Sequence, residues 1–568
     1  MLKLKDLKSA QGLIILFALL LAAPALAKKP VPKPSPKAPK GPTYDYDVFN
    51  YRLANDPGSL HPVLGNGYYF SLVAPYLFDS LLVQDENTHA WLPALAEKWK
   101  VSKDGKTTTF TLRKGAKWHD GRPVSAFDVK FSFDVYFDQR FLESQNKTYF
   151  EAIQEAKVVN EQTVQFIAKA PYFLTFNRLA KLRIIPKHYY DSENPRDSAF
   201  NKKAIGSGPY LLKEWERNQH ILLEKNPNYW GTAVPTFKKL HAFKKVQFKI
   251  VFEDATALEM LKKGDLDYLE LAPEDFENLS KNPSKHYKAV RVKNSGDYNL
   301  SYKFIAWNER NPLFKDRRVR QALSQLIHRD FILEKIFGGQ FEKTRGPFGN
   351  SSPHSSPRVL AVSFNRLKAI ELLKQAGWTQ GPQGWFMRLG ERELPFEFTL
   401  LYTSESAEKF LTLIQEDFKM VGIKMNLKRV AFSLMGGLMD DKQFDALQSG
   451  WNPEFDTDWK MVFHTSAIAP PGRNYMSYSN PVVDRLLDEI RVTLDVRKQI
   501  PLWQAAHEEI AEDQPYAFLF SPKYAFYGVS SKLARSADTL KYGIGIETWR
   551  PAGKNPPPQP AKKKAGKR

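Results

Sequence analysis

Residues 75–133 read PYLFDSLLVQDENTHAWLPALAEKWKVSKDGKTTTFTLRKGAKWHDGRPVSAFDVKFSF, and near the middle of this stretch polar and apolar side chains alternate. The segment Thr107–Arg113, TTTFTLR, has the period of two that is typical of a half-buried strand. Asp104-Gly105 before it and Asp120-Gly121 after it each predict a tight turn. The stretch therefore predicts a strand between two turns, with His119 in a structural position beside the second turn.

Helices are predicted farther along the chain, where apolar residues recur at helical spacing. The first lies within Phe314–Phe337, with Asp316 as N-cap and Gly338-Gly339 at its end. Ser363 is the predicted cap of the second helix, which Gly377 closes. A third runs from about Ala407 to Val421, before the strand-like segment 423–430, and Asn480-Pro481 opens a fourth. The fold class is α/β (mixed α+β), with no internal repeat.

The chain of 568 residues contains no cysteine, which excludes disulfides, thiol nucleophiles and thiolate metal sites. Hydrophobic residues make up 42% of it. Because single cores stop growing at about 250 to 300 residues, a chain of this length forms two or more domains.

The first 27 residues have the pattern of a secretory signal peptide. Three lysines precede the apolar run Leu13–Leu21, and the segment ends in Ala25-Leu26-Ala27. The apolar run is too short to cross about 30 Å of hydrocarbon, which argues against a membrane anchor. We expect cleavage after Ala27 and export to the periplasm, and without a cysteine the chain cannot be a lipoprotein.

Much of the positive charge lies in the terminal segments. Residues 1–27, 28–42 and 551–568 contribute +2, +5 and +6 of the formal net charge of +21, which leaves +8 for the rest. We interpret residues 28–43 as a Pro/Lys-rich linker and 551–568 as a basic Pro/Lys-rich tail. Their charge leaves open a weak attraction to acidic envelope polymers or anionic membranes, and no nucleic-acid partner is expected.

No catalytic constellation emerges from the sequence. Ser144–Lys147 has the S-x-x-K spacing of penicillin-recognising enzymes but lacks the companion K-T-G and S-D-N motifs. Metalloprotease, Walker and dinucleotide-binding patterns do not occur. We therefore expect no catalytic residue, no metal site and no cofactor, so that the protein is not an enzyme.

Four blocks of sequence carry a family resemblance. They are residues 75–133, quoted above; Ile205–Trp230, IGSGPYLLKEWERNQHILLEKNPNYW; Asn311–Phe331, NPLFKDRRVRQALSQLIHRDF; and Ala369–Trp378, AIELLKQAGW. In this order, the chain resembles the family 5 extracellular solute-binding proteins, which include oligopeptide-, dipeptide- and nickel-binding proteins of ABC transporters. The resemblance extends from about Tyr51 to Tyr527.

The resemblance implies a two-lobed periplasmic binding protein fold with an extra subdomain and a hinge between the lobes. By this likeness, lobe I comprises residues 44–80, 201–295 and 523–550, and the extra subdomain comprises 81–200. Lobe II would then be residues 296–522. Closure of the lobes over a ligand would exclude water, so that charge pairs and hydrogen bonds inside gain strength.

The resemblance also implies a ligand site, centred on residues 444–459, FDALQSGWNPEFDTDW. In peptide-binding members, an aspartate three residues after the tryptophan pairs with the α-ammonium group of the ligand. Here Glu454 follows Trp451 at that spacing, with Asp456 and Asp458 close behind. In the first lobe, Asn66 and Tyr68 correspond to a segment that contacts the peptide backbone. His61 stands where an aspartate is usual, and Trp118, Trp215 and Trp230 are interpreted as packing residues.

The function expected from these observations is capture of a peptide or peptide-like ligand and its delivery to an ABC transporter permease, by a monomer. One alternative is a binding protein of this fold for another solute, such as a cell-wall peptide, a metal chelate or an oligosaccharide, since one fold hosts many ligands. A ligand-sensing accessory protein without a transport role is a second. A hydrolase is disfavoured because no nucleophile, base or metal set is present.

Overall fold

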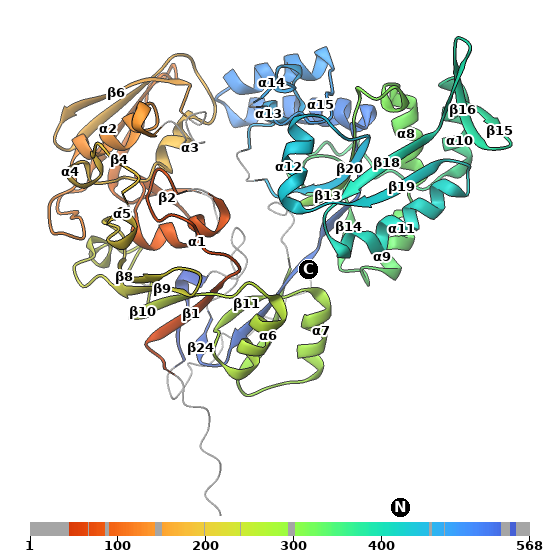
Figure 1. Ribbon diagram of the computed structural model, residues 1–568. Helices are drawn as coiled ribbons and strands as arrows, with labels where there is room; N and C mark the ends of the chain where they lie inside the picture. The colour runs from red at the N-terminus through yellow and green to blue at the C-terminus, as the bar shows by residue number, and fades with distance from the viewer. Residues whose placement is uncertain are drawn as a thin grey trace, which may run out of the picture. The chain divides into compact units, whose positions relative to one another are not determined.

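The structure, a computed structural model, describes residues 45–65, 67–85, 90–141, 150–197, 199–238, 240–293, 301–453, 457–470, 472–535 and 546–552 (Figure 1). All of them belong to one contact-defined unit, which begins at Tyr44. The predicted signal peptide, the predicted linker 28–43 and the tail beyond Ala552 lie outside the described residues. Within the described part of the chain, no helix is long and apolar enough to cross a membrane.

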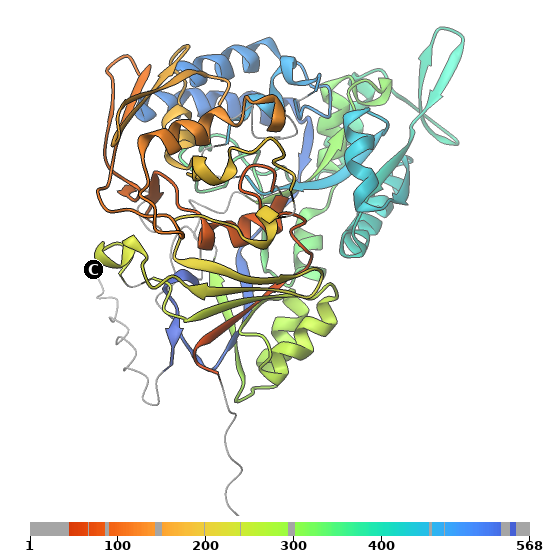
Figure 2. The same cartoon turned by 60° about the vertical axis from the view of Figure 1, so that its left-hand side comes forward.

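A seven-stranded sheet draws its strands from both ends of the described chain. Its order is β12-β23-β11-β1-β10-β9-β8, with bounds β1 (Val48–Leu53), β8 (Tyr210–Glu216), β9 (His220–Lys225), β10 (Lys245–Ile250), β11 (Tyr268–Glu270), β12 (Tyr287–Lys293) and β23 (Tyr524–Ser530). Strand β1 runs parallel to β10 and β11, and the other pairs are antiparallel. Helices α6 (Asp254–Lys263) and α7 (Pro273–Lys281) lie beside it in Figures 1 and 2, where Leu261 and Leu279 share a core with Leu269 and Phe526.

A four-stranded antiparallel sheet forms in the region of the opening motif. Its order is β4-β5-β7-β6, with bounds β4 (Ala96–Val101), β5 (Thr107–Leu112), β6 (Ile153–Asn160) and β7 (Thr163–Ala168). The strand predicted at Thr107–Arg113 is confirmed, and its residues alternate between half-buried and buried. Gly105 and Gly121 have φ values of +70° and +88°, which the two predicted turns require.

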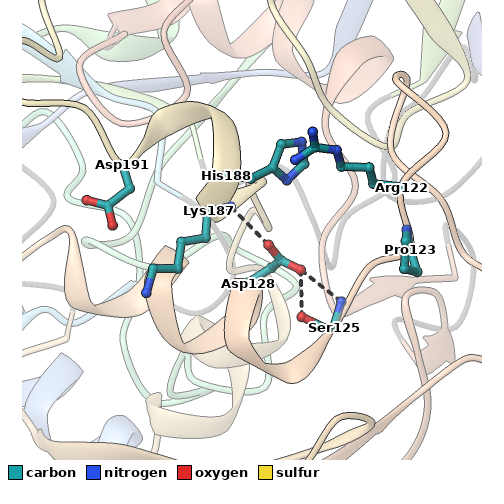
Figure 3. A pocket seen from close by; sticks show the side chains of 7 residues that line it. All are labelled: Arg122, Pro123, Ser125, Asp128, Lys187, His188 and Asp191. Atoms are coloured by element: carbon teal, nitrogen blue, oxygen red, sulfur yellow. Dashed lines mark hydrogen bonds between the residues drawn. The ribbon is translucent and has the colours of Figure 1, made fainter.

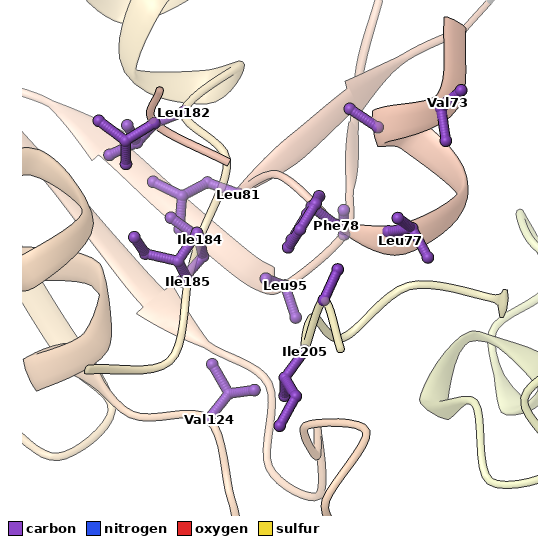
Figure 4. Close-up of a cluster of buried hydrophobic side chains, with 14 of the residues drawn as sticks. Val73, Leu77, Phe78, Leu81, Leu95, Val124, Leu182, Ile184, Ile185 and Ile205 are labelled. Carbon is purple, nitrogen blue, oxygen red and sulfur yellow. The ribbon is translucent and has the colours of Figure 1, made fainter. Parts of the chain in front are cut away.

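The core beside this sheet includes α1 (Gly67–Leu77). Figure 4 shows Val73, Leu77 and Phe78 near side chains that come from much later in the chain, among them Ile184 and Ile205. The short helices of this region are α2 (Ala126–Asp134), α3 (Thr175–Ala180), α4 (Lys187–Tyr190) and α5 (Ala199–Lys202). Trp118 and Trp230 are buried and Trp215 packs against the same core, which confirms their interpretation as packing residues.

A five-stranded sheet with the order β19-β18-β20-β13-β21 follows in the second half of the chain. Its strands are β13 (Tyr302–Trp307), β18 (Glu397–Tyr402), β19 (Lys424–Arg429), β20 (Ala446–Trp451) and β21 (Tyr516–Phe518). Strand β18 is parallel to β19 and β20, and β13 is antiparallel to both β20 and β21. Its helices are α8 (Arg317–Gln325), α9 (Arg329–Lys335), α10 (Arg366–Gln375), α11 (Glu405–Lys419), α12 (Phe432–Asp440), α13 (Lys460–Phe463), α14 (Pro481–Val492) and α15 (Val496–Asp513).

Small sheets complete the description. They are β2 (Leu82–Gln84) with β3 (Trp91–Pro93); β14 (Phe341–Lys343) with β22 (Phe520–Pro522); β15 (Thr379–Gly381), β16 (Gly384–Leu389) and β17 (Arg392–Pro395); and β24 (Leu533–Ala534) with β25 (Arg550–Pro551). The last strand reaches Pro551, one residue into the predicted tail.

Two of the four helix predictions need correction. The single helix expected in 314–337 is two helices, because the Arg329 guanidinium bonds the Ser324 carbonyl oxygen (2.7 Å) near the end of α8 and the His328 Nδ1 caps Phe331 N–H (3.2 Å) at the start of α9. The cap of α10 is Asn365 and not Ser363, since Asn365 Oδ1 accepts from Lys368 N–H (2.9 Å). The helices expected from about Ala407 and at Pro481 are confirmed. The mixed α and β class is confirmed as well.

Candidate functional site

Two chain crossovers join the seven-stranded and five-stranded sheets. One leaves β12 after Lys293 and enters β13 at Tyr302, and the other passes from β22 to β23 at Tyr524. Lys293 and Tyr524 are register partners, so both crossovers lie at the same edge of the seven-stranded sheet. The carboxyl ends of its parallel strands, at Leu53, Ile250 and Glu270, are at this edge too, since Glu270 pairs with Tyr527 near the start of β23. In open sheets that contain parallel strands, ligands bind outside the carboxyl ends.

Trp451 occupies the equivalent edge of the five-stranded sheet. It ends β20, one of three parallel strands, and its register partner is Tyr302, the first residue of β13 after the crossover. Its half-buried indole lies 6.4 Å from the Phe304 ring at 23°, and its Nε1–H donates to Tyr516 Oη at 3.3 Å. A Cβ on Gly450 would lie 3.0 Å from the Tyr302 carbonyl oxygen. The Gly-Trp pair thus lets the two strands approach closely where the tryptophan ends the sheet.

The loop after Trp451 begins beside both crossovers. Ser301 Oγ–H donates to Asn452 Oδ1 (2.6 Å), and Ser521 Oγ–H donates to the Ser301 carbonyl oxygen (2.8 Å). The predicted ligand residues Glu454 and Asp456 lie outside the described residues, and so does Asn66.

Asp458, the third acid of this loop, already has partners within the protein. Its side chain is 6% exposed, and it accepts a hydrogen bond from Tyr172 Oη–H at 2.8 Å. Arg491 Nε lies 3.3 Å from the same carboxylate oxygen, and the guanidinium groups of Arg491 and Arg178 lie 4.8 and 4.9 Å from the Tyr172 ring centroid. This geometry makes Asp458 a structural residue that links the segment before α3 to α14.

Tyr68 is in the first turn of α1 and is 63% exposed. Burial, then the Glu270 carboxylate and then Tyr69, raise its pKa. Our sequence interpretation missed Glu270 and its neighbour Tyr51. No spacing signal could have revealed them, because β1, α1 and β11 are brought together only by the sheet order.

The Ile205–Trp230 block has a structural role. Asp79 accepts hydrogen bonds from Ser207 Oγ (2.9 Å), Tyr229 Oη (3.2 Å) and Trp230 Nε1 (2.8 Å). Burial raises the pKa of Asp79 to about 7, against the effect of these donors. A Cβ on Gly206 would lie 1.9 Å from the Leu77 carbonyl oxygen, so only glycine fits there.

His119 and His61 also hold backbone in place. His119 Nδ1 accepts from Gly206 N–H and its Nε2 bonds the Gly208 carbonyl oxygen, both at 3.1 Å, which confirms a structural histidine. His61 Nδ1 accepts from the N–H groups of Val63 and Leu64, each at 3.2 Å. An aspartate oxygen could accept the same bonds, so the histidine is compatible with the aspartate that the family resemblance leads us to expect at this position.

A polar surface pocket of about 570 Å³ lies near α2 and α4 (Figure 3). Its Asp128 carboxylate accepts from Ser125 N–H and Oγ–H and from Lys187 N–H, all within 2.9 Å, and its His188 bonds Asp120 at 2.7 Å. These contacts cap two short helices, so the pocket is explained by the fold.

One group of three described residues has donor atoms close enough to hold a metal ion. The side chains of Glu214, Glu216 and His220 place these atoms within 4.8 Å of one another on the β8–β9 hairpin. His220 forms ion pairs with both glutamates, at 3.6 and 3.9 Å, when it is protonated. The three side chains therefore form a small charge cluster whose members pair with one another at the surface.

Comparison with known proteins gives consistent results. A family model described as "Bacterial extracellular solute-binding proteins, family 5 Middle" matches residues 90–467. The oligopeptide-binding protein AppA of Bacillus subtilis is 30% identical over 458 residues, which are 78% of this chain and 81% of AppA.

Two solved structures extend the likeness to the fold. AppA of Bacillus subtilis in complex with a nonapeptide has a TM-score of 0.72 and 27% identity, over 89% of this chain and 99% of that one. NikZ of Campylobacter jejuni in complex with Ni(L-His) has a TM-score of 0.74 and 23% identity, over 89% and 100%. This chain therefore has the two-lobed fold of periplasmic binding proteins, while the predicted residue boundaries of its lobes stay a prediction.

Proposed function

This chain belongs to the bacterial extracellular solute-binding proteins of family 5, and we propose that it binds a peptide or peptide-like ligand in the periplasm and delivers it to an ABC transporter permease. The observation that carries the proposal is the position of Trp451. It ends a parallel strand at the edge where the chain crosses between the two large sheets, and Glu454 follows three residues later.

The edge has the features of a ligand site and not of a catalytic one. Trp451 offers a half-buried aromatic surface, and Tyr68 offers an exposed one in the first turn of α1. Aromatic side chains supply large contact area at low entropic cost, and backbone and loop groups supply the polar contacts. Ligand capture then needs only binding and release, through a population shift toward a closed form.

We further propose that Glu454 binds the α-ammonium group of the ligand. Asp458 is already engaged by Tyr172 and Arg491, so we assign the ligand to Glu454, with Asp456 as the next acid to test. A charge-assisted hydrogen bond inside a closed site is stronger than a surface pair, and removing one partner of a buried pair commonly costs about 3 to 5 kcal/mol.

The test uses native mass spectrometry first and calorimetry second. The purified protein is mixed with a defined pool of tetra- and pentapeptides, and the peptide retained most strongly is titrated into wild type, Glu454→Gln and the control Glu391→Gln, which changes an exposed acid in the β16–β17 turn. We expect Glu454→Gln to bind the peptide about a hundredfold more weakly, which corresponds to about 2.7 kcal/mol.

Acetylation of the peptide amine should produce a similar loss in wild type and little further loss in Glu454→Gln, because both changes remove the same interaction. The control should match wild type. If Glu454→Gln binds the free-amine peptide within about threefold of wild type, well under 1 kcal/mol, Glu454 does not bind the ammonium group and Asp456 is tested next. If no peptide is retained while a nickel chelate or an oligosaccharide is, the ligand class is wrong.

A further inference from the structure

Three tyrosines share one face of the seven-stranded sheet at its crossover edge. Tyr51 and Tyr268 are register partners on β1 and β11, with ring centroids 5.4 Å apart and nearly parallel. Tyr268 also stacks on Tyr527 of β23 at 5.5 Å. Helices α6 and α7 pack with Leu269, Leu271 and Phe526, the alternate residues of these strands, so the tyrosines lie on the opposite face. Together with Tyr68 they are called the tyrosine face.

Glu270 ends β11 on the same side. Side chains alternate along a strand, so Glu270 and Tyr268 are on one face, and Glu270 is the register partner of Tyr527. Its side chain reaches solvent, but the protein around the carboxyl group removes part of its hydration and so raises its pKa. After burial, its carboxylate is among the groups that raise the pKa values of Tyr51, Tyr68 and Tyr268.

Glu270 differs from the other described carboxyl groups whose pKa is raised. Burial raises the pKa of seven carboxyl groups of the described residues: Asp79, Asp267, Glu270, Asp275, Glu309, Asp417 and Glu547. For all except Glu270, a cation or a hydrogen-bond donor opposes that effect, as Lys532 does for Asp267 and Arg320 for Glu309; for Glu547 the donor is its own backbone N–H. No described cationic side chain acts on Glu270, although the chain has 83 Lys and Arg against 62 Asp and Glu.

The second acid without a counter-charge lies at the same tyrosines. Glu547, in the short helix Ile546–Thr548, raises the pKa of Tyr51 together with Glu270. Its Oε2 is buried, and no hydrogen-bond donor among the described residues contacts it. Two carboxylates for which the described residues supply no cation therefore both raise the pKa of Tyr51.

We propose that Glu270 and the tyrosine face form a subsite for a positively charged side chain of the ligand, so that this chain selects peptides that carry lysine or arginine. The inference rests on the proposed function. An ammonium or guanidinium group would give Glu270 its missing counter-charge through a charge-assisted hydrogen bond. The surrounding rings would attract the same cation through their faces. A metal ion is disfavoured, because metal sites assemble several convergent ligands and the one such group among the described residues is on the β8–β9 hairpin.

The test compares peptides that differ by one charge. Pentapeptides of alanine with a free amine carry lysine at one position, from the second to the fifth, and each has a matched peptide with the uncharged norleucine there. Calorimetry measures both series against wild type, Glu270→Gln and the control Glu274→Gln. Glu274 is an exposed acid on α7, the helix that packs on the opposite face of the sheet.

At one position, we expect wild type to bind the lysine peptide about tenfold or more tightly than its norleucine partner, and Glu270→Gln to reduce that preference to less than about threefold. The control should keep the preference of wild type. If wild type binds both series equally at every position, or if Glu270→Gln keeps the full preference, the subsite is refuted while the proposed function stands. If wild type binds no peptide of either series or of the retained pool, the proposed function fails and this inference fails with it.

Discussion

Replacement of Asp458 by asparagine should lower the stability of the protein and leave its recognition of a ligand ammonium group unchanged. The prediction separates two acids of one loop, since Glu454 is proposed to bind the ligand. Asp458 is buried, and its carboxylate accepts from Tyr172 Oη–H at 2.8 Å and from Lys460 N–H at 3.1 Å. Asparagine keeps the size of the side chain and removes the charge.

The expected magnitude follows from these contacts. A hydrogen bond to a charged group contributes about 1.5 to 3 kcal/mol. The ion pair with Arg491 adds less, because the arginine side chain is 34% exposed and can be hydrated when the charge is lost. Since the asparagine oxygen can still accept from Tyr172, we expect Asp458→Asn to cost about 1 to 2 kcal/mol. Asp458→Ala should cost about 2 to 4 kcal/mol, because it leaves the Tyr172 hydroxyl buried without an acceptor.

A double-mutant cycle with Tyr172→Phe measures the contact itself. Tryptophan fluorescence follows urea unfolding of four proteins: wild type, Asp458→Asn, Tyr172→Phe and the double variant. The free energies of unfolding of the transition that includes this region are compared. The two losses should be less than additive, with a coupling of about 1 kcal/mol or more, since each change weakens the same hydrogen bond.

The reasoning is refuted by a coupling below about 0.3 kcal/mol, the usual scatter for independent sites. It is equally refuted if Asp458→Asn unfolds like wild type but binds the free-amine peptide a hundredfold more weakly. In that case Asp458, and not Glu454, would be the acid that meets the ligand.

Three further predictions concern pH, a buried ion pair and ligand closure. His61 is 2% exposed, and burial lowers its pKa to about 4 from an ordinary 6.5. Between these two pH values the unfolded chain therefore binds one more proton than the folded chain does. The free energy of unfolding falls as the pH falls through this window. From pH 7 to 5 this residue should account for about 2 kcal/mol; urea unfolding of His61→Asn should show a slope smaller by one proton, and an unchanged slope contradicts the assignment. Lys532→Met should cost about 3 to 5 kcal/mol at pH 7, because it leaves the buried Asp267 carboxylate without the ammonium group 2.8 Å away; the combined Asp267→Asn and Lys532→Met chain should recover more than half of that loss in urea unfolding, and no recovery would contradict a paired charge. Addition of the strongest-binding peptide should lower the radius of gyration in solution scattering, because two-lobed proteins close over their ligands; scattering unchanged at saturation would count against closure.

Several local features could be read from sequence because local forces decide them. The strand at Thr107–Leu112, the turns at Gly105 and Gly121 and the Asn480 cap of α14 depend on residues within a few positions of one another. The Ser363 cap failed because Asn365, two residues on, offers the same kind of oxygen. The single helix in 314–337 failed because Arg329 folds back onto Ser324, which periodicity does not reveal.

Only part of the candidate site could be predicted in the same way. Trp451 and Tyr68 were predicted through the family resemblance; Trp451 ends β20 opposite Tyr302 and Tyr68 lies in the first turn of α1, while their contact with a ligand stays a prediction. The adjoining acid Asp458 could not be assigned from the loop sequence, because its partner Tyr172 lies 286 positions away.

The sequence by itself determined the fold family, the absence of disulfides and the segment in which to look for a ligand acid, since residue types and short spacings carry that information. Only the tertiary structure decided which charged groups already have partners. Lys532 reaches Asp267, Arg320 reaches Glu309, and no described cation reaches Glu270. Sheet order brings residues from distant positions together, and burial makes an unpaired charge costly, as at Asp267 and Glu309, so the pairing of charges is a property of the fold and not of the local sequence.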